Sequence, residues 1–404
     1  MAKPVKAQHM FGLNLSWRRV TVVFLIDVAV LVLAGRWPGD PPGASYAWWA
    51  GVGVAVLVAV LALVTCRRIP LTGVLSALVV NPFANPQAVL TEGCTPAVDH
   101  QRRYGREPVG IREHQGRLVS VVAVSARDDV PAGRHHAGAP STAMLPVEPV
   151  ARALRQFDVA LDGIDIVSAG VSVGVPDETA AADADGAEAA PAQFDHFVIE
   201  HRETWLVLRM DPQRNVAAVA TRDSVASTLA AATERLVHDL EGRHITAHAV
   251  TADEFTAIED TVLAGLEPEQ VRVHWGYLRE KDTATEITSL WVSPHDITPE
   301  NLEQLWLAHD GPVVVTVRLT PGRSDRTDVS ALVRYHSAGR LDRHARAGVN
   351  RLGGRQLAAI AVSLPVPERG PGLAIPIREL AAGEHLTVPV DSAPRRAARA
   401  GAQS

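Results

Sequence analysis

Two long apolar runs within the first 66 of the 404 residues constrain this chain more than any other feature. The first extends from Val20 to Gly35 and the second from Tyr46 to Cys66, and no apolar run of comparable length follows. A helix needs about 20 apolar residues to cross a hydrocarbon core of about 30 Å. The second run has that length without a charge, whereas the first is shorter and contains Asp27. The runs predict a transmembrane helical hairpin over residues 20–66, followed by a soluble body.

The basic residues around the hairpin predict its orientation. Lysine and arginine flank it on both outer sides, before the first run (Lys3, Lys6, Arg18, Arg19) and after the second (Arg67, Arg68). Such flanks stay in the cytoplasm. We therefore expect a membrane protein that crosses twice, with both termini and the large soluble body in the cytoplasm. Two alternatives stay open: a cleaved signal peptide as the first run, or one span accompanied by a buried helix.

Asp27 in the middle of the first run requires an explanation, because a charged side chain at mid-membrane costs about 2.5–3.5 kcal/mol. One explanation is a contact inside a multi-helix assembly, and the other is an acid tolerated near the edge of a short helix. On the second run, Gly51 and Gly53 would let helices approach closely. We expect Asp27, Gly51 and Gly53 to contact neighbouring transmembrane segments of this chain or of a partner.

Composition excludes several function classes. The formal net charge is −6 and no basic stripe with interleaved aromatic residues occurs, so nucleic acid is not an expected partner. The only cysteines, Cys66 and Cys94, form no C-x-x-C pair, and a cytoplasmic body would keep them reduced. We therefore expect neither a disulfide nor a zinc site.

The chain is expected to divide into seven segments. These are a cytoplasmic N-terminal segment (1–19), the hairpin (20–66), a connector (67–109), a first α/β unit (110–173), a disordered acidic loop (174–193), a second α/β unit with a weak internal repeat (194–390) and a disordered tail (391–404). The fold class is a membrane hairpin followed by mixed α/β layers of sheet and helix. The pattern does not determine a strand order.

Periodicity predicts the main elements of the two units. In the first unit we expect a strand at 117–125, a helix at 147–161 and a strand at 164–173. In the second unit, strands at 204–210 and 216–221 would form a hairpin, followed by a helix at 224–241 and a strand at 244–250. Thr251 with Glu254, and Thr298 before Pro299, mark two helix starts. Strands at 313–319 and 329–336 and a helix around 346–363 would form the second copy of the repeat.

A search for catalytic motifs is mostly negative. No P-loop sequence occurs. Ser172 satisfies a G-x-S-x-G pattern, but it lies inside a predicted strand rather than at the strand–helix turn that a nucleophile needs. Four other sets are better explained as solvent-exposed or turn residues (His135 with His136, Asp183 with Asp185, Asp162 with Asp165, and the glycines of 348–354). We therefore predict no catalytic, cofactor-binding or metal-binding residues.

Two polar clusters deserve a functional interpretation. The connector holds a charged cluster at 99–106, in which Arg102, Arg103 and Arg106 could contact anionic headgroups or a partner subunit. The second cluster, residues 211–215 with 221–224, is either functional or a turn followed by a helix N-cap.

Several of these stretches resemble the EccE family, a membrane component of the mycobacterial type VII (ESX) secretion system. The resemblance is carried by the N-terminal double span and by residues 94–103, 204–220, 223–240 and 348–359. It covers nearly the whole chain and is weakest in the acidic loop and the tail.

The resemblance implies a structural subunit at the periphery of an inner-membrane complex, beside EccB, EccC and EccD, with ATP hydrolysis left to EccC. It brings no catalytic residue to this chain. The alternative is a membrane-anchored cytoplasmic enzyme of the glycosyltransferase type that uses carboxylates of the body. The two hypotheses differ in whether Asp162, Asp165 or Asp211 converge in one cleft.

Overall fold

A computed structural model gives the structure of the chain and describes most of its 404 residues. The described ranges are 11–13, 17–36, 46–66, 69–70, 85–90, 95–102, 105, 107–126, 143–176, 194–222, 224–323, 325–367, 373–381 and 383–390. The chain forms two compact units, residues 1–84 with 374–376 and residues 85–373 with 377–404. We call the second unit the body.

The first unit contains two helices at the places where the apolar runs predict them. These are α1 (Trp17–Gly35) and α2 (Tyr46–Leu63), which pack against each other, and we call the pair the N-terminal hairpin. Three short strands, β1 (Phe11–Leu13), β2 (Val64–Cys66) and β3 (Ile69–Pro70), form a small antiparallel sheet. Among the described residues, no helix combines the length and apolarity that a membrane crossing requires, so the structure does not confirm the predicted spans.

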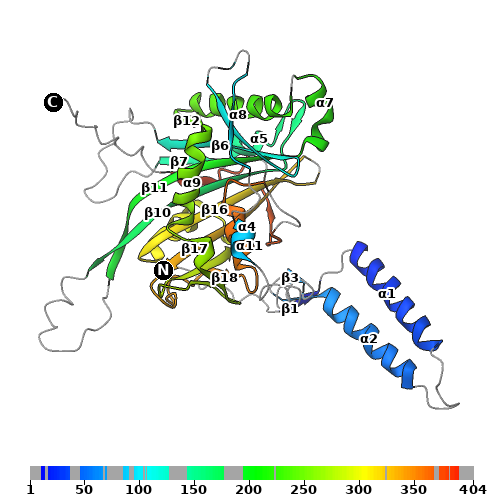
Figure 1. The fold of residues 1–404 in the computed structure, drawn as a ribbon. Helices are drawn as coiled ribbons and strands as arrows, with labels where there is room; N and C mark the ends of the chain where they lie inside the picture. Colours follow the sequence, from blue (N-terminus) through cyan, green and yellow to red (C-terminus); the bar gives the residue numbers. More distant parts are fainter. Residues whose placement is uncertain are drawn as a thin grey trace, which may run out of the picture. The chain divides into compact units, whose positions relative to one another are not determined.

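The body is built on one antiparallel sheet of 13 described strands (Figure 1). Its main path runs β13 (Val271–Val273), β14 (Leu278–Glu280), β15 (Glu286–Val292), β17 (Thr327–Ser337), β16 (Gly311–Pro321), β10 (Gly163–Pro176), β11 (Phe194–Met210), β6 (Arg117–Ala126), β5 (Val109–His114) and β4 (Val98–His100). Three further strands pair beside this path: β12 (Ile245–Ala249) with β6, β18 (Val349–Arg351) with β15, and β19 (Arg378–Glu379) with β17. The mixed α/β class is therefore confirmed, with an antiparallel sheet as its centre.

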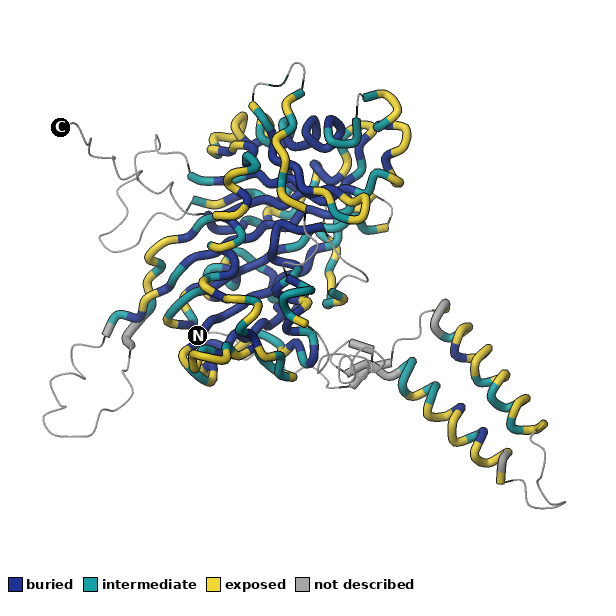
Figure 2. The backbone as a smooth tube through the Cα atoms, viewed as in Figure 1, coloured by how far each residue is buried: buried dark blue, intermediate teal, exposed yellow. Residues whose placement is uncertain are grey.

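Helices cover the first face of the sheet, where alternate strand residues form a continuous apolar core. The covering elements are α5 (Val147–Arg152), α8 (Val225–Glu241), α10 (Pro299–Gln304) and the 3₁₀ turn η5 (Trp306–Ala308). Strands β7 (Ala143–Pro146) and β20 (Thr387–Val390) pair with each other and add to this core. Figure 2 shows the buried residues gathered along the strands of the body.

The second face is covered by α9 (Ala252–Leu263), α11 (Gln356–Ser363) and the short α4 (Pro86–Leu90), and it buries charge. Arg334 from β17 donates to the Val262 carbonyl at the end of α9 and, at 3.1 Å, to the Ser363 hydroxyl at the end of α11. A cation at these helix ends opposes the negative ends of the helix dipoles. Burial lowers the pKa of Arg334 to about 9, so it keeps its charge at neutral pH.

Next to Arg334, the buried His336 predicts a pH-dependent stability. Burial, together with the neighbouring Arg334 and His309, holds its pKa well below 6.5. The unfolded chain therefore binds a proton below about pH 6.5 that the folded chain does not, and the free energy of unfolding falls by up to about 1.4 kcal/mol per pH unit of acidification. Urea titrations between pH 7.5 and 5 test this. His336→Gln should reduce the pH dependence of the free energy of unfolding by the contribution of one proton. An unchanged slope in that variant would contradict the role assigned to His336.

Most predicted elements of the body are confirmed. Strands β6, β10, β12, β16 and β17 and helix α8 form where periodicity places them. The capping box is present, since Glu254 accepts a hydrogen bond of 2.8 Å from the Thr251 backbone N–H at the start of α9. Thr298 accepts from the Asn301 N–H and caps α10. The predicted acidic loop (174–193) begins too early, because residues 174–176 still pair with β11 as the end of β10. Its remaining residues 177–193 and the tail 391–404 lie outside the described residues.

The predicted helix at 147–161 is wrong beyond its first turns. Helix α5 ends at Arg152, and strands β8 (Arg155–Gln156) and β9 (Val159–Ala160) follow as a tight hairpin. Apolar spacing suggested a longer helix, yet Phe157 lies at the turn with φ of +54° and is 98% exposed. A bidentate ion pair from Arg222 to Asp158, at 2.6 and 2.9 Å, fixes the turn and lowers the pKa of Asp158 to about 2.

The predicted second strand of the hairpin at 216–221 is also wrong, because this segment is helical. Asp211 accepts a hydrogen bond of 2.8 Å from the Gln213 N–H and caps the 3₁₀ turn η2 (Pro212–Asn215), which continues into helix α7 (Val216–Ala220). Pro212 at the first position and the alanines of α7 both favour a helix.

The helix predicted around 346–363 begins ten residues later than expected. Residues 349–351 form strand β18 against β15, and α11 starts only at Gln356. The Gln356 side chain explains the start, since it bonds the backbone N–H and carbonyl of Ser289 in β15 at 2.7 and 3.0 Å.

Candidate functional site

Asp27 lies on the side of α1 that faces α2. It shares a helical stripe with the buried Val23 and the partly buried Val30 and Ala34. One carboxylate oxygen of Asp27 is buried and has no hydrogen-bond partner among the described residues. Burying a polar atom without a partner is unfavourable, so this oxygen would gain from a donor supplied by another molecule.

Gly51 marks the closest approach of the two helices, whereas Gly53 does not. A Cβ at Gly51 would overlap the Cβ of Ala34 on α1, so only glycine permits this distance between the helices. Gly53 lies on the exposed side of α2, and a Cβ there would meet no atom within 4 Å. The two glycines predicted to contact other segments therefore occupy opposite sides of the helix.

The outer surface of the N-terminal hairpin is apolar and uncovered (Figure 2). Large side chains on both helices are more than half exposed, among them Phe24 at 63%, Leu33 at 66%, Trp49 at 71% and Leu57 at 57%. Exposed apolar surface of this extent marks a contact with other protein or with lipid.

The described ionisable residues of the connector cluster (Asp99, His100, Arg102) each contact a residue on or beside a helix of the body. Arg102 forms an ion pair with Glu234 on α8, Asp99 accepts a hydrogen bond of 2.7 Å from the Ala252 N–H at the start of α9, and His100 lies 2.9 Å from the Ser227 hydroxyl. Arg103 and Arg106, the other predicted contacts, lie outside the described residues. Arg102 thus holds the connector to α8 in this structure.

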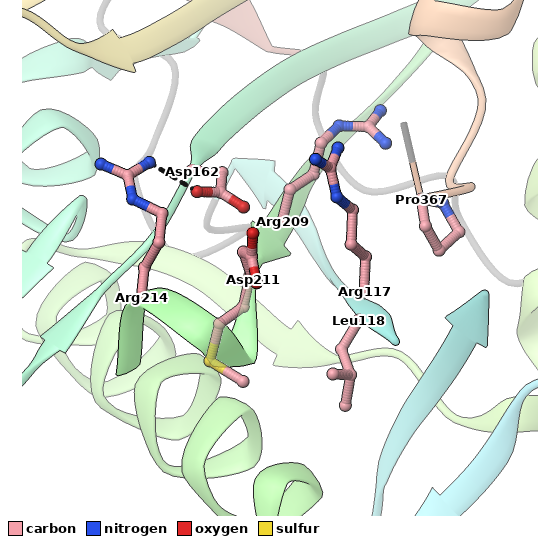
Figure 3. Close-up of a pocket in the computed structure, with 8 residues that line it drawn as sticks. Arg117, Leu118, Asp162, Arg209, Asp211, Arg214 and Pro367 are labelled. Atoms are coloured by element: carbon pink, nitrogen blue, oxygen red, sulfur yellow. Dashed lines mark hydrogen bonds and ion pairs between the residues drawn. The ribbon is translucent and has the colours of Figure 1, made fainter. Parts of the chain in front are cut away.

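Asp162 and Asp211 do line one pocket of the body, of about 250 Å³ (Figure 3). Antiparallel pairing brings them there, because Asp162 precedes β10, Asp211 follows β11, and Gly163 pairs with Arg209. The other lining residues are Arg117, Leu118, Arg209, Met210, Arg214 and Pro367. The convergence that the enzyme hypothesis requires is therefore present for two of the three carboxylates.

The charged groups of this pocket that have known contacts are already engaged within the chain. Asp162 accepts from Arg214 at 2.7 Å, and Asp211 caps η2. Arg209 donates to Asp165 at 2.8 Å and to the carbonyls of Val362 and Leu364 at 3.0 and 3.1 Å. The arrangement fits a structural role, in which these hydrogen bonds and ion pairs hold the segment after α11 against the sheet.

Asp165 lies away from the pocket, fully buried on the second face of the sheet. It pairs with Arg209 and lies 3.4 Å from the Nε of Arg318 on β16. The buried charges of this face were not predicted from the sequence, although each strand shows the same pattern. Asp165, Arg209, Arg318 and Arg334 are single charges within apolar runs of β10, β11, β16 and β17. A charge in such a strand must be paired when buried.

The other motif residues form no site among the described parts of the chain. Ser172 lies inside β10 and donates to the Val198 carbonyl at 3.5 Å. Gly353 packs against the ring of Trp275, and Gly354 donates to the Trp275 carbonyl at 2.7 Å. His135, His136, Asp183 and Asp185 lie outside the described residues. Within the described ranges, no three His, Cys, Asp or Glu side chains gather as a metal site would require.

Comparison with known proteins connects these features to a family. A family model described as "Putative type VII ESX secretion system translocon, EccE" matches residues 198–292, which include most of β11 and all of α8 and β15. The chain is 49% identical over 395 residues to the ESX-5 secretion system protein EccE5 of Mycobacterium tuberculosis, covering 96% of this chain and 97% of that protein. It is 46% identical over 394 residues to EccE5 of Mycobacterium marinum, covering 96% of both. A more distant relative, the ESX-1 secretion system protein EccE1 of Mycobacterium tuberculosis, is 26% identical over 300 residues, which are 70% of this chain and 57% of that protein.

Proposed function

This chain belongs to the EccE family of type VII ESX secretion system subunits, and from that premise we propose that it is a non-catalytic scaffold of the secretion complex. The N-terminal hairpin would anchor it in the inner membrane beside other subunits, and the body would dock on sibling subunits in the cytoplasm. Its expected partners are EccB, EccC and EccD, with ATP hydrolysis assigned to EccC.

The observation that carries this proposal is the uncovered apolar surface of the hairpin together with the unpartnered oxygen of Asp27. Lipid or neighbouring helices would cover the side chains of Phe24, Leu33 and Trp49, and a donor from another subunit would satisfy the carboxylate. The basic flanks place both termini and the body in the cytoplasm under this proposal.

The engaged charges of the pocket lined by Asp162 and Asp211 favour a structural over a catalytic role. A general acid or base must be able to exchange a proton with a substrate, whereas Asp162 is held by Arg214 and Asp211 by a backbone N–H. The convergence of Asp162 and Asp211 is the feature that the enzyme alternative predicts, but both carboxylates already have partners within the chain.

Replacing Asp27 with leucine tests the anchoring role. We expect Asp27→Leu to reduce the yield of sibling subunits that co-purify with the tagged chain from detergent-solubilised membranes about tenfold, since one charge-assisted hydrogen bond contributes about 1.5–3 kcal/mol. Asp27→Asn should retain more of the yield because the amide still forms hydrogen bonds. Equal recovery of the partners by all three proteins would contradict the role of Asp27.

A matched pair of glycine variants separates helix packing from partner contact. Gly51→Leu should disrupt the α1–α2 contact, whereas Gly53→Leu leaves that contact intact. If Gly53→Leu also lowers the partner yield, the exposed side of α2 contacts a subunit.

Protease protection of the body in intact vesicles whose cytoplasmic side faces inward tests the topology. Digestion of the body by protease added outside such vesicles would contradict a cytoplasmic body.

A further inference from the structure

One edge of the body carries a concentration of positive charge. Residues 272–286 and 340–351 contain seven Lys and Arg against four Asp and Glu, in a chain whose net charge is −6. We call these seven cations the basic surface (Arg272, Arg279, Lys281, Arg340, Arg343, Arg346, Arg351). They come from strands β13, β14 and β18, from the loop between β17 and β18 and, for Lys281, from the turn between β14 and β15. An open hollow of about 680 Å³ is lined by four of these cations (Arg272, Arg279, Lys281, Arg340) and by Glu280 and Glu286, of which Glu286 pairs with Arg279.

Four arginines of the basic surface have no carboxylate partner among the residues that the structure describes. Arg272, Arg340, Arg343 and Arg351 form no ion pair with any residue that the structure describes, and all four are exposed. By contrast, Arg102, Arg209 and Arg378 each contact a carboxylate. The basic surface therefore offers guanidinium groups whose donors face solvent.

The arginines also lie close enough to repel one another. Partial burial, and then the charges of Arg351, Arg340 and Arg343, lower the pKa of Arg346. Keeping like charges together without anions is unfavourable, and an external anion would relieve it. Arginine presents a planar fork that matches the oxygens of a phosphate group.

Aromatic side chains adjoin the basic surface and narrow the choice of ligand. Trp275 is 42% exposed on the turn between β13 and β14, where its ring is fixed against Gly353. Tyr277 is partly buried and stacks on His274 with ring centroids 4.7 Å apart. Tryptophan and tyrosine beside Lys and Arg are typical of surfaces that lie at the headgroup level of a bilayer.

We propose that the basic surface binds the phosphate groups of anionic lipid headgroups and so places this edge of the body against a membrane surface. The inference rests on the proposed membrane anchoring of the hairpin, which would keep the body near the bilayer. The hollow among Arg272, Lys281 and Arg340 receives one phosphate, and Arg343 and Arg351 contact neighbouring headgroups. A long nucleic acid fits less well, because the rest of the chain is net negative and would repel the polymer beyond the patch.

Hydrogen exchange of the full chain in nanodiscs tests the proposal. Peptides from residues 338–351 should exchange at least about fivefold more slowly in nanodiscs that contain phosphatidylglycerol than in nanodiscs of phosphatidylcholine alone. High salt should abolish the difference, since it screens exposed charges. The double variant Arg340→Glu with Arg343→Glu should lose the protection. Arg243→Glu, an exposed arginine after α8, should keep it.

Each other outcome has a defined meaning. Equal exchange in both lipid compositions overturns the proposal while leaving the anchoring role intact, provided that the chain remains in the nanodiscs. Failure of the chain to remain in any nanodisc would contradict the anchoring itself. Protection by inorganic pyrophosphate in phosphatidylcholine nanodiscs, without an effect of phosphatidylglycerol, would identify a site for free phosphate and overturn the lipid assignment. Protection by a DNA oligonucleotide alone would likewise overturn it.

Discussion

Replacing Arg209 with alanine is expected to lower the free energy of unfolding of the body by about 3–5 kcal/mol. Arg209 is 6% exposed and donates to the fully buried Asp165 and to the carbonyls of Val362, Leu364 and Val366. Its loss leaves a buried carboxylate with only Arg318 nearby, at 3.4 Å, and frees the segment that follows α11. Urea titration followed by the fluorescence of the buried Trp205, Trp291 and Trp306 measures the effect.

Arg214 provides the matched control at the same pocket. The Arg214 side chain, which pairs with Asp162, is 57% exposed. Arg214→Ala should therefore lower the free energy of unfolding by no more than about 1 kcal/mol. Arg209→Met combined with Asp165→Leu should recover part of the lost stability, because the paired charges are removed together, while Arg318 loses its neighbouring carboxylate. Equal effects of Arg209→Ala and Arg214→Ala would refute the structural role assigned to the buried pair.

Gly170→Val is expected to prevent the body from folding, and Gly170→Ala to cost about 3 kcal/mol or more, at the upper end for overpacking. Gly170 lies in β10, which pairs with β11 on one side and β16 on the other. A Cβ at Gly170 would overlap the His201 carbonyl oxygen and lie 2.9 Å from the Cα of Arg202, both backbone atoms of β11. Because β10 is hydrogen-bonded to a strand on each side, it cannot shift away from an added methyl group.

Gly163→Ala, near the start of the same strand, is the control for Gly170→Ala. The nearest atom to a Cβ at Gly163 is the Leu319 carbonyl oxygen at 3.2 Å, which a small shift relieves. We expect a loss below about 1 kcal/mol there. Thermal unfolding of the two purified variants distinguishes them, and the interpretation fails if Gly170→Ala melts at the wild-type temperature.

Local signals predicted the long strands and the well-capped helices of the body. Runs such as those of β6, β16 and β17 are apolar because both faces of the sheet are covered, and the side-chain caps Ser224 and Thr298 mark the starts of α8 and α10. These features depend on residues within a few positions of each other. Sequence reasoning therefore found them without knowledge of the tertiary structure.

The errors arose where distant residues decide the local structure. Spacing alone favoured a helix through Phe157, but Arg222, far along the chain, holds Asp158 in a tight turn. The start of α11 is set by Gln356 bonding to Ser289 across the sheet. The strand order and the convergence of Asp162 with Asp211 likewise depend on pairings between distant segments. No periodicity within a window of the sequence contains that information.

The candidate contacts of the hairpin and connector were named from charge and size alone. In the structure these residues have different surroundings. Gly51 lies in the contact between α1 and α2, Gly53 lies on the outer side of α2, and Arg102 forms an ion pair with Glu234 on α8. Which of them meets a partner subunit stays a prediction. The division of the body into two α/β units also stays a prediction, and one sheet takes strands from both segments.

The pairing of β7 with β20 has a consequence for biosynthesis. These strands join residues 143–146 to residues 387–390, so the apolar core cannot close until residue 390 has left the ribosome. Such distant pairings form slowly and leave apolar surface exposed meanwhile. The N-terminal helices leave the ribosome long before that moment, so their exposed apolar side chains are present while the core of the body is still incomplete.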